Sequence, residues 1–265
     1  MRVSFIKMHG LGNDFVVLDG RNTALPPLTG PFARALADRR TGIGCDQLIV
    51  LEPSAAATAR MRIFNPDGGE VEACGNATRA IGLLLGQAAT IETLGGLLEV
   101  APHQAGISVD MGEPRFEWDR IPLAYAMDTH TMPLAWDSLE NPTAVNVGNP
   151  HVIFFVPDCD AIELDRLGPE IEHDPLFPAR INVNVATLVD RGHIRLRVWE
   201  RGAGETLACG TGACATAIGA MRRGLVDRKV TVSLPGGDLL IEWTEAGRIM
   251  MTGPAVESFR GDFDP

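Results

Sequence analysis

The sequence predicts an α+β protein with two pseudo-symmetric domains, each a mostly antiparallel β-sheet or barrel wrapped around a central α-helix. Three observations predict this fold. Part of the first half of the chain aligns with part of the second half, short runs alternate apolar and polar residues, and each half contains one nearly uncharged segment of helical length. Alternating runs are typical of half-buried strands, and a helix that is apolar all round must be buried.

The internal repeat is centred on two cysteines. Residues 61–75 align without a gap with residues 196–210, and the offset is constant, because 209 − 74 = 135. Cys74 therefore aligns with Cys209, and Glu70 with Glu205. Flanking matches keep the same order, and six extra residues in the second half are expected in a longer helix after Cys209. Collinear matches of this kind indicate duplicated halves.

Each half shows the same order of expected elements. Residues 60–64 and 194–198 alternate in polarity and predict strands. Residues 76–87 and 211–223 are rich in Ala, Gly, Ile and Leu, lack strand alternation and predict the two buried helices. The dipeptides Gly95-Gly96 and Gly236-Gly237 predict turns between later strands.

The domain boundary is expected near residue 115. We predict an N-terminal domain of residues 1–115, completed by residues 255–265, and a C-terminal domain of residues 116–254. Four prolines (Pro114, Pro122, Pro133 and Pro142) lie between residues 113 and 142 and indicate the interdomain connection.

Composition narrows the class of protein. The 265 residues are 45% apolar and carry a formal charge of −11, which is typical of a globular protein and disfavours nucleic acid or an anionic membrane as partner. No stretch is apolar and long enough to predict a signal peptide or a membrane span. Five cysteines, an odd number, favour a reducing compartment over a disulfide framework. We therefore expect a cytoplasmic protein.

Cys74 and Cys209 each stand where a loop is expected to enter a buried helix, followed by a glycine. Unpaired N–H groups and the helix dipole at such a position favour a thiolate, so we expect a lowered thiol pKa. The same N–H groups can hold a carboxylate. If pseudo-twofold symmetry places the thiols on opposite faces of one α-carbon, one thiol can remove the α-proton and the other can deliver a proton.

A lone cysteine is more often a small buried residue than a reactive one, and we expect this of Cys45, Cys159 and Cys214. For Cys74 and Cys209 the duplication favours function, because both halves retain the thiol at the same point. The sequence contains no nucleotide-binding glycine motif and no evident metal-ligand cluster, so we expect neither a cofactor nor a metal.

Several motifs that extend over nearly the whole chain resemble diaminopimelate epimerase. In chain order they are Phe5-Ile-Lys-Met-His-Gly-Leu-Gly-Asn-Asp-Phe15, Arg40-Thr-Gly-Ile-Gly-Cys-Asp-Gln47, Asn65-Pro-Asp-Gly-Gly-Glu-Val-Glu-Ala-Cys-Gly-Asn76, Gly148-Asn-Pro-His151, Asn182-Val-Asn184 and Glu200-Arg-Gly-Ala-Gly-Glu-Thr-Leu-Ala-Cys-Gly-Thr-Gly-Ala-Cys214. Each motif alone is weak, but the set is specific, and it implies the fold of that family.

The resemblance implies interconversion of LL- and meso-2,6-diaminopimelate, in lysine and peptidoglycan precursor biosynthesis, without pyridoxal phosphate or metal. It implies that Cys74 and Cys209 are the two bases, and that His151 and Glu200 assist catalysis by setting thiol protonation and orientation. It also implies a homodimer. The substrate-binding residues that it implies are Asn13, Gln47, Asn65, Gly75, Asn76, Asn149, Asn182, Glu200, Arg201, Gly210 and Thr211.

Arg201 also has a physical argument, since a guanidinium beside a cleft rich in asparagine suits a second carboxylate. Without the resemblance, a solvated arginine would be the commoner explanation, just as His151 could be a structural histidine. The sequence departs from the family pattern at Pro66, Ala77 and Ala80. Phe259 stands where a tyrosine is common near the dimer contact, and it lacks the hydroxyl.

Alternative functions remain open at this point. Other two-cysteine racemases of the same fold act on proline, hydroxyproline or histidine, although proline-type enzymes typically carry histidine where this chain has Asn76. A phenazine-biosynthesis-like isomerase shares the fold but lacks the cysteine pair. A dithiol redox protein or a non-catalytic amino-acid-binding protein is a further alternative, and the absence of a Cys-x-x-Cys motif disfavours the redox role.

Overall fold

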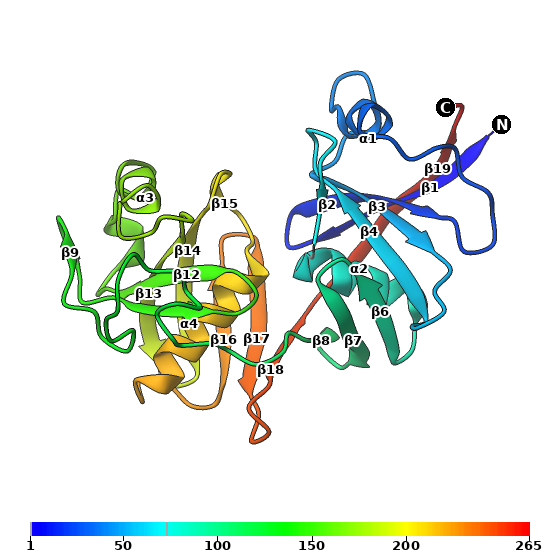
Figure 1. Ribbon diagram of the computed structural model, residues 1–265. Helices are drawn as coiled ribbons and strands as arrows, with labels where there is room; N and C mark the ends of the chain where they lie inside the picture. Colours follow the sequence, from blue (N-terminus) through cyan, green and yellow to red (C-terminus); the bar gives the residue numbers. More distant parts are fainter. Residues whose placement is uncertain (1, 73) are drawn as a thin grey trace. The chain divides into compact units, whose positions relative to one another are not determined.

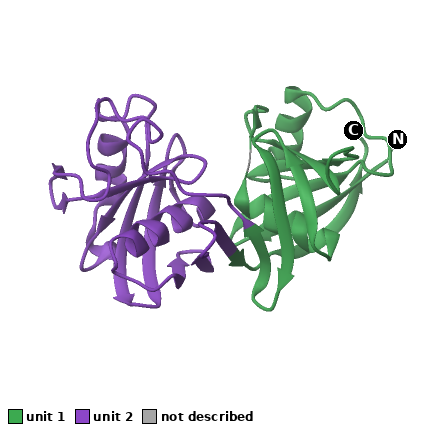
Figure 2. Ribbon diagram, turned by 60° about the horizontal axis from the view of Figure 1, so that its bottom comes forward, with its two compact units in different colours: residues 1–109, 252–265 green, residues 110–251 purple. Residues whose placement is uncertain are grey.

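The computed structural model describes residues 2–72 and 74–265. The chain divides into two compact units, which are coloured separately in Figure 2. Unit 1 consists of Met1–Val109 and Thr252–Pro265, and unit 2 of Asp110–Met251. Strands dominate both units and each contains few helices (Figure 1), so the predicted α+β class is confirmed.

Unit 1 is a mixed sheet with two helices. Strand β1 pairs antiparallel with β2 and with β19, β2 runs parallel to β3, and β4 pairs antiparallel with β3 and parallel with β6. The order continues through the antiparallel pairs β6–β7 and β7–β8. The elements are β1 (Val3–Gly10), β2 (Asn13–Asp19), α1 (Gly30–Ala37), β3 (Gln47–Glu52), β4 (Ala59–Phe64), β5 (Glu70–Val71), α2 (Gly75–Leu85), β6 (Ala89–Thr93), β7 (Gly96–His103), β8 (Gly106–Asp110) and β19 (Val256–Phe263).

The central strands of unit 1 are apolar on both faces. Val16 and Val50 belong to the hydrophobic cluster that packs against α1. Their neighbours Val17 and Ile49, which point to the opposite face, are also completely buried. Helix α2 contacts β1, β6, β7 and β19. A sheet covered on both faces therefore explains why these strands do not alternate in polarity.

Unit 2 repeats the same pairing pattern. Strand β12 pairs antiparallel with β11 and parallel with β13, and β14 pairs antiparallel with β13 and parallel with β16. Strands β16 and β17 are antiparallel. The elements are β9 (Ala135–Trp136), β10 (Leu139–Glu140), β11 (Thr143–Asn146), β12 (Pro150–Phe155), η1 (Cys159–Ala161), α3 (Leu164–Glu172), β13 (Asn182–Asp190), β14 (His193–Glu200), β15 (Gly204–Thr206), α4 (Gly210–Arg222), β16 (Lys229–Leu234), β17 (Gly237–Trp243) and β18 (Ile249–Gly253).

The duplication extends to side-chain contacts. In unit 1, Arg62 Nε donates to Glu70 at 2.8 Å, across the β4–β5 hairpin. In unit 2, Arg197 Nε donates to Glu205 at 2.8 Å, across the β14–β15 hairpin. Both arginines also donate through Nη2, so each pair is bidentate. The offset is again 135 (197 − 62), so the two ion pairs are equivalent. Each one joins the two strands of the hairpin that precedes a cysteine.

The two predicted helices are confirmed, and both begin directly after a cysteine. Helix α4 is buried along most of its length and contacts six strands of unit 2 (β11, β12, β13, β14, β16 and β17). It has 13 residues and α2 has 11, so the helix takes up only part of the six-residue difference between the halves. Of the remaining four residues, three lie in the loop that leads to β16 and one lies in β16, which is one residue longer than β6.

Residues 113–142, where the prolines indicated the interdomain connection, are folded into one of the two units. This segment belongs to unit 2 and carries the short β9–β10 hairpin. Its residues Met132, Trp136 and Leu139 join a hydrophobic cluster with side chains of β12, β13 and α3. Trp136 also donates to Asp174 at 2.9 Å. Burial of these apolar side chains outweighs the preference of proline-rich segments for exposed loops.

Across the described residues, none of the helices combines the length and the apolar composition that a membrane crossing requires.

Candidate active site

Cys74 and Cys209 are the N-cap residues of α2 and α4. Both have extended backbone conformations, and each sulfur accepts a hydrogen bond from the backbone N–H three residues later, Ala77 at 3.5 Å and Gly212 at 3.3 Å. Cap residues of this kind satisfy one of the N–H groups that lack a partner in the first helical turn. The two thiols therefore occupy equivalent positions, each beside backbone donors suited to an anion.

Unit 1 brings together five of the predicted site residues in two groups. The Oδ1 atom of Asn13 accepts from Asn76 Nδ2 at 3.1 Å and lies 3.9 Å from the Cys74 sulfur. Gln47 Nε2 donates to Asn65 Oδ1 at 3.1 Å. Asn76 is buried and the other four side chains are partly buried. Gly75, the sixth predicted residue of this unit, is the first residue of α2.

Unit 2 surrounds Cys209 with hydrogen-bonding groups. The sulfur lies 3.6 Å from the Thr211 hydroxyl, and the carboxylate of Glu200 is near enough for its charge to act on the thiol. Glu200 also accepts from the Thr206 hydroxyl at 2.5 Å. Gly210, the first residue of α4, is buried.

The expected lowering of the thiol pKa is wrong for Cys209. Burial and the nearby charge of Glu200 raise the pKa of Cys209 well above its usual value, although the hydrogen bonds from Thr211 and the Gly212 N–H act in the opposite direction. Burial likewise raises the pKa of Glu200. Desolvation of the thiolate therefore exceeds the stabilisation that the helix start provides.

His151 lies in β12 and is completely buried. Its Nε2 atom is 2.9 Å from Asn149 Oδ1, and its Nδ1 atom is 3.1 Å from Asn184 Nδ2. Asn149 Nδ2 donates to the Thr211 hydroxyl at 3.2 Å. His151 thus reaches Cys209 through two intermediate side chains.

Asn182 and Arg201 are joined by a hydrogen bond from the backbone N–H of Arg201 to Asn182 Oδ1, at 2.9 Å. The Arg201 guanidinium is exposed and donates to the backbone carbonyl of Ala179 at 2.9 Å. Its position at the end of β14 leaves further N–H groups of the guanidinium available to an anion.

The other three cysteines are buried, as predicted. Cys45, Cys159 and Cys214 are each no more than 1% exposed, and burial raises the pKa of Cys45 to about 11. Cys159 and its neighbours Asp158 and Asp160 form a group that could hold a cation. The guanidinium of Arg195 forms an ion pair with Asp160, however, which already compensates part of the negative charge.

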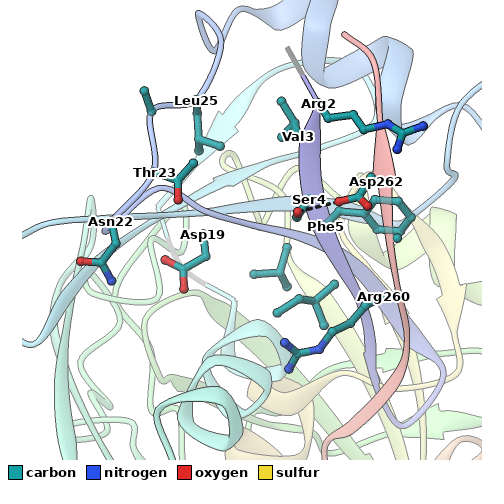
Figure 3. Close-up of a pocket in the computed structure, with 14 residues that line it drawn as sticks. Arg2, Val3, Ser4, Phe5, Asp19, Asn22, Thr23, Leu25, Arg260 and Asp262 are labelled. Atoms are coloured by element: carbon teal, nitrogen blue, oxygen red, sulfur yellow. Dashed lines mark hydrogen bonds between the residues drawn. The ribbon is translucent and has the colours of Figure 1, made fainter.

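A separate pocket of about 560 Å³ lies in unit 1 between β1, β2, β19 and the loop after β2 (Figure 3). Its polar lining includes Arg2, Asp19, Asn22, Arg260 and Asp262. None of the predicted site residues lines it, so this pocket is distinct from the cysteine environments.

Asp46 and Asn184 contact predicted site residues, but the residue patterns did not single them out. Asp46 Oδ2 accepts from Asn13 Nδ2 at 3.0 Å, and Asn184 contacts His151 as described above. Both residues lie inside the motifs quoted for the resemblance. The spacing of Asn182 and Asn184 was a usable signal, since alternate residues of a strand share one face.

The comparisons with known proteins agree with these motifs. The family model described as diaminopimelate epimerase matches residues 5–117 and 143–257, which together make up most of the chain. A protein of Erythrobacter litoralis named diaminopimelate epimerase is 67% identical over 264 residues, covering 100% of this chain and 98% of that protein.

Solved structures show the class of fold, which this chain shares with phenazine biosynthesis proteins of the PhzF family and with a hydroxyproline epimerase. A phenazine biosynthesis protein of the PhzF family from Bacillus anthracis superimposes with a TM-score of 0.72 at 17% identity, covering 100% of both chains. A hydroxyproline epimerase from Agrobacterium vitis gives a TM-score of 0.67 at 16% identity, covering 99% of this chain and 91% of that one. Within this class, the family match and the relative at 67% identity decide the assignment. The chain belongs to the diaminopimelate epimerase family.

Proposed function

We propose that this protein interconverts LL- and meso-2,6-diaminopimelate, with the thiols of Cys74 and Cys209 as its two acid–base groups. The observation that carries the proposal is the equivalent placement of the two thiols as N-caps of buried helices, in a chain of the diaminopimelate epimerase family. Epimerisation needs a proton to leave one face of the α-carbon and another to arrive on the opposite face, which two separate groups accomplish without turning the intermediate.

The helix starts provide the electrostatic part of the mechanism. Removal of an α-proton places negative charge on the adjacent carboxylate, and fixed N–H dipoles stabilise such charge as it develops. Backbone N–H groups at Gly75 and Asn76 and at Gly210 and Thr211 lie in the first turns of α2 and α4, and N–H groups at a helix start suit an anion. These groups would bind the reacting carboxylate.

Each thiol would act in both directions of the reaction. The thiol that removes the α-proton in one direction delivers a proton in the other, so the two residues exchange roles when the reaction reverses.

The remaining predicted residues would hold the amino-acid groups of the substrate. Asn65 and Gln47 form one hydrogen-bonded pair, and Asn182 and Arg201 form another. Their amide and guanidinium groups suit the ammonium and carboxylate of the distal end. Glu200 lies beside Cys209 and would contact the substrate on that side.

We also propose a homodimer in the cytoplasm, with a role in lysine and peptidoglycan precursor synthesis. Phe259 and Val256 on β19 are 52% and 44% exposed, and Phe259 packs edge-on against Phe5. Exposed apolar side chains on one strand support an interface with a second copy. The free thiols of Cys45, Cys159 and Cys209 support a reducing compartment. We further propose that the two compact units are the duplicated domains.

The substrate is tested by incubating the reduced protein separately with LL-diaminopimelate, L-proline, trans-4-hydroxy-L-proline and L-histidine, followed by chiral chromatography. We expect the meso isomer from LL-diaminopimelate and no inversion of the other three. Inversion of one of those three instead would favour a rival racemase. Binding of diaminopimelate without any inversion would favour an amino-acid-binding protein.

A further inference from the structure

Asn13 and Asn149 are equivalent residues of the two halves, but their side-chain amides point in opposite directions. Asn13 directs its oxygen toward the helix start, where it accepts from Asn76 and faces the Cys74 sulfur. Asn149 directs its nitrogen toward the helix start, where it donates to Thr211. Thr211 in turn contacts the Cys209 sulfur.

The orientation of Asn13 is determined by Asp46. A carboxylate only accepts hydrogen bonds, so the group of Asn13 that lies 3.0 Å from Asp46 Oδ2 must be the NH2. Asp46 is itself held in place, because its N–H donates to Asp14 Oδ1 at 2.9 Å and its Oδ2 accepts from the Asp14 N–H at 3.1 Å. Arg39 Nη2 lies 2.6 Å from both carboxylates.

The orientation of Asn149 is determined by Asn184 through His151. Asn184 Nδ2 donates to the backbone carbonyl of Val152 at 3.0 Å, which identifies it as the NH2 group. The same NH2 faces Nδ1 of His151, so Nδ1 is the acceptor of a neutral ring and Nε2 carries the hydrogen. Nε2–H then donates to Asn149, whose facing atom must be the oxygen.

The residues that impose these orientations break the symmetry of the duplication. Asp46 aligns with Ile181 (181 − 135 = 46), and Asn184 aligns with Ile49 (184 − 135 = 49). The strand register agrees, since Ile49 faces Val17 and Asn184 faces Ile153 in the equivalent parallel pairs. His151 faces Asn182 where Phe15 faces Gln47. Each half therefore has a polar group where the other half is apolar.

We infer that Asp46 and Asn184 are positioning residues, which hold the paired asparagines so that Cys74 faces a hydrogen-bond acceptor and Thr211 beside Cys209 receives a donor. With its oxygen occupied by Asn149, the Thr211 hydroxyl is free to donate to the Cys209 sulfur. A hydrogen-bond acceptor beside a cysteine stabilises the protonated thiol, and a hydrogen-bond donor stabilises the deprotonated thiolate. The two equivalent thiols therefore have different polar surroundings. The effect of this difference on turnover rests on the proposed function.

The first test reads the His151 tautomer by nitrogen-15 NMR of the full-length protein, and it does not depend on activity. We expect a neutral ring protonated on Nε2 between pH 6 and pH 8. In Asn184→Leu, which lacks the donor to Nδ1, a population protonated on Nδ1 should appear. A wild-type ring protonated on Nδ1, or a tautomer unchanged by Asn184→Leu, would overturn the role of Asn184.

The second test compares Asp46→Asn with Asp46→Ala. Both variants lose the charge, but only asparagine offers an oxygen that can still accept from Asn13. We expect kcat with LL-diaminopimelate to stay within about threefold of wild type in Asp46→Asn and to fall about 10- to 100-fold in Asp46→Ala, with a smaller change in KM. Equal losses of kcat in two folded variants would overturn the role of Asp46. Absence of turnover in wild type would contradict the proposed function instead, and the NMR measurement would then decide the inference.

Discussion

The Nε2 atom of His151 lies 2.9 Å from Oδ1 of Asn149, in surroundings that bury the imidazole completely. Burial lowers the pKa of His151 to about 3, and the charge of Arg201 acts in the same direction. A group whose pKa is lower in the folded protein than in the unfolded chain binds fewer protons when folded. Its contribution to stability is therefore present above pH 6.5 and is lost as the pH falls toward the folded value.

Substitution of His151 by glutamine should reduce the pH dependence of stability. Between pH 7 and pH 5 we expect wild type to lose about 2 kcal/mol more unfolding free energy than His151→Gln. The reason is that His151 becomes protonated in the unfolded chain over this range, whereas the buried ring of the folded protein stays neutral. Urea unfolding at the two pH values measures this difference. The same substitution at the exposed His103 is the control, and an equal pH dependence in wild type and His151→Gln would refute the assignment.

Substitution of Glu200 by glutamine should make Cys209 more acidic. The negative charge of Glu200 is one cause of the raised pKa of Cys209, so its removal lowers that pKa while burial continues to raise it. We expect alkylation of Cys209 by iodoacetamide at pH 8 to become faster, roughly tenfold for each unit by which the pKa falls.

Tandem mass spectrometry of the peptide that contains Cys209 and Cys214 measures this rate and separates the two thiols. Glu205→Gln is the matched control, because Glu205 pairs with Arg197 instead of Cys209. An unchanged or slower reaction of Cys209 in Glu200→Gln would show that the carboxylate does not act on the thiol.

Alanine substitutions at two glycines of α4 distinguish an effect on core packing from an effect on catalysis. A methyl group added at Gly212 would lie 2.8 Å from Asn184 Oδ1 and 3.2 Å from the Cys209 sulfur, and one added at Gly219 would lie 2.8 Å from Thr143 Cγ2. We expect both alanine variants to lose about 1–3 kcal/mol of stability, as overpacked cores do. Only Gly212→Ala should also lower kcat, by at least about tenfold. Equal kcat values in the two variants, at a temperature where both are folded, would argue against a strict geometry at the Cys209 thiol.

Phe259 tests the proposed dimer. Phe259→Asp places a charge on an exposed apolar position of β19, so we expect it to weaken association of the 28.4 kDa chains. Light scattering after size exclusion measures the mass of the assembly. The charge-neutral change at Leu97, an exposed apolar residue of β7, is the control (Leu97→Ser). A Phe259→Asp variant as dimeric as wild type would place the interface elsewhere.

Much of the fold was predictable because the sequence repeats itself. The alternation in residues 60–64 and 194–198, and its absence after each cysteine, identified strands β4 and β14 and helices α2 and α4. The packing of residues 113–142 was not predictable, because proline content describes backbone preference, whereas the burial of Trp136 and Leu139 depends on partners distant in the sequence.

The placement of the thiols was predictable, but their electrostatics were not. A cysteine before a glycine at a helix start indicates an N-cap, and both cysteines are N-caps. The pKa of Cys209 depends on how deeply the thiol is buried and on Glu200, the last residue of β14. Likewise, Asp46 meets Asn13 only because β2 and β3 are adjacent.

The central claim is that two thiols, one from each half, carry out an epimerisation of diaminopimelate. The most direct measurement is the early time course of LL-diaminopimelate conversion in D2O, with deuterium at the α-carbons of substrate and product followed by mass spectrometry. Since separate groups remove and deliver the proton, we predict that the meso product carries one solvent deuterium while the remaining LL substrate carries almost none, and that Cys74→Ser and Cys209→Ser each abolish turnover. Product that retains the original hydrogen, or full turnover by either single variant, would contradict the account.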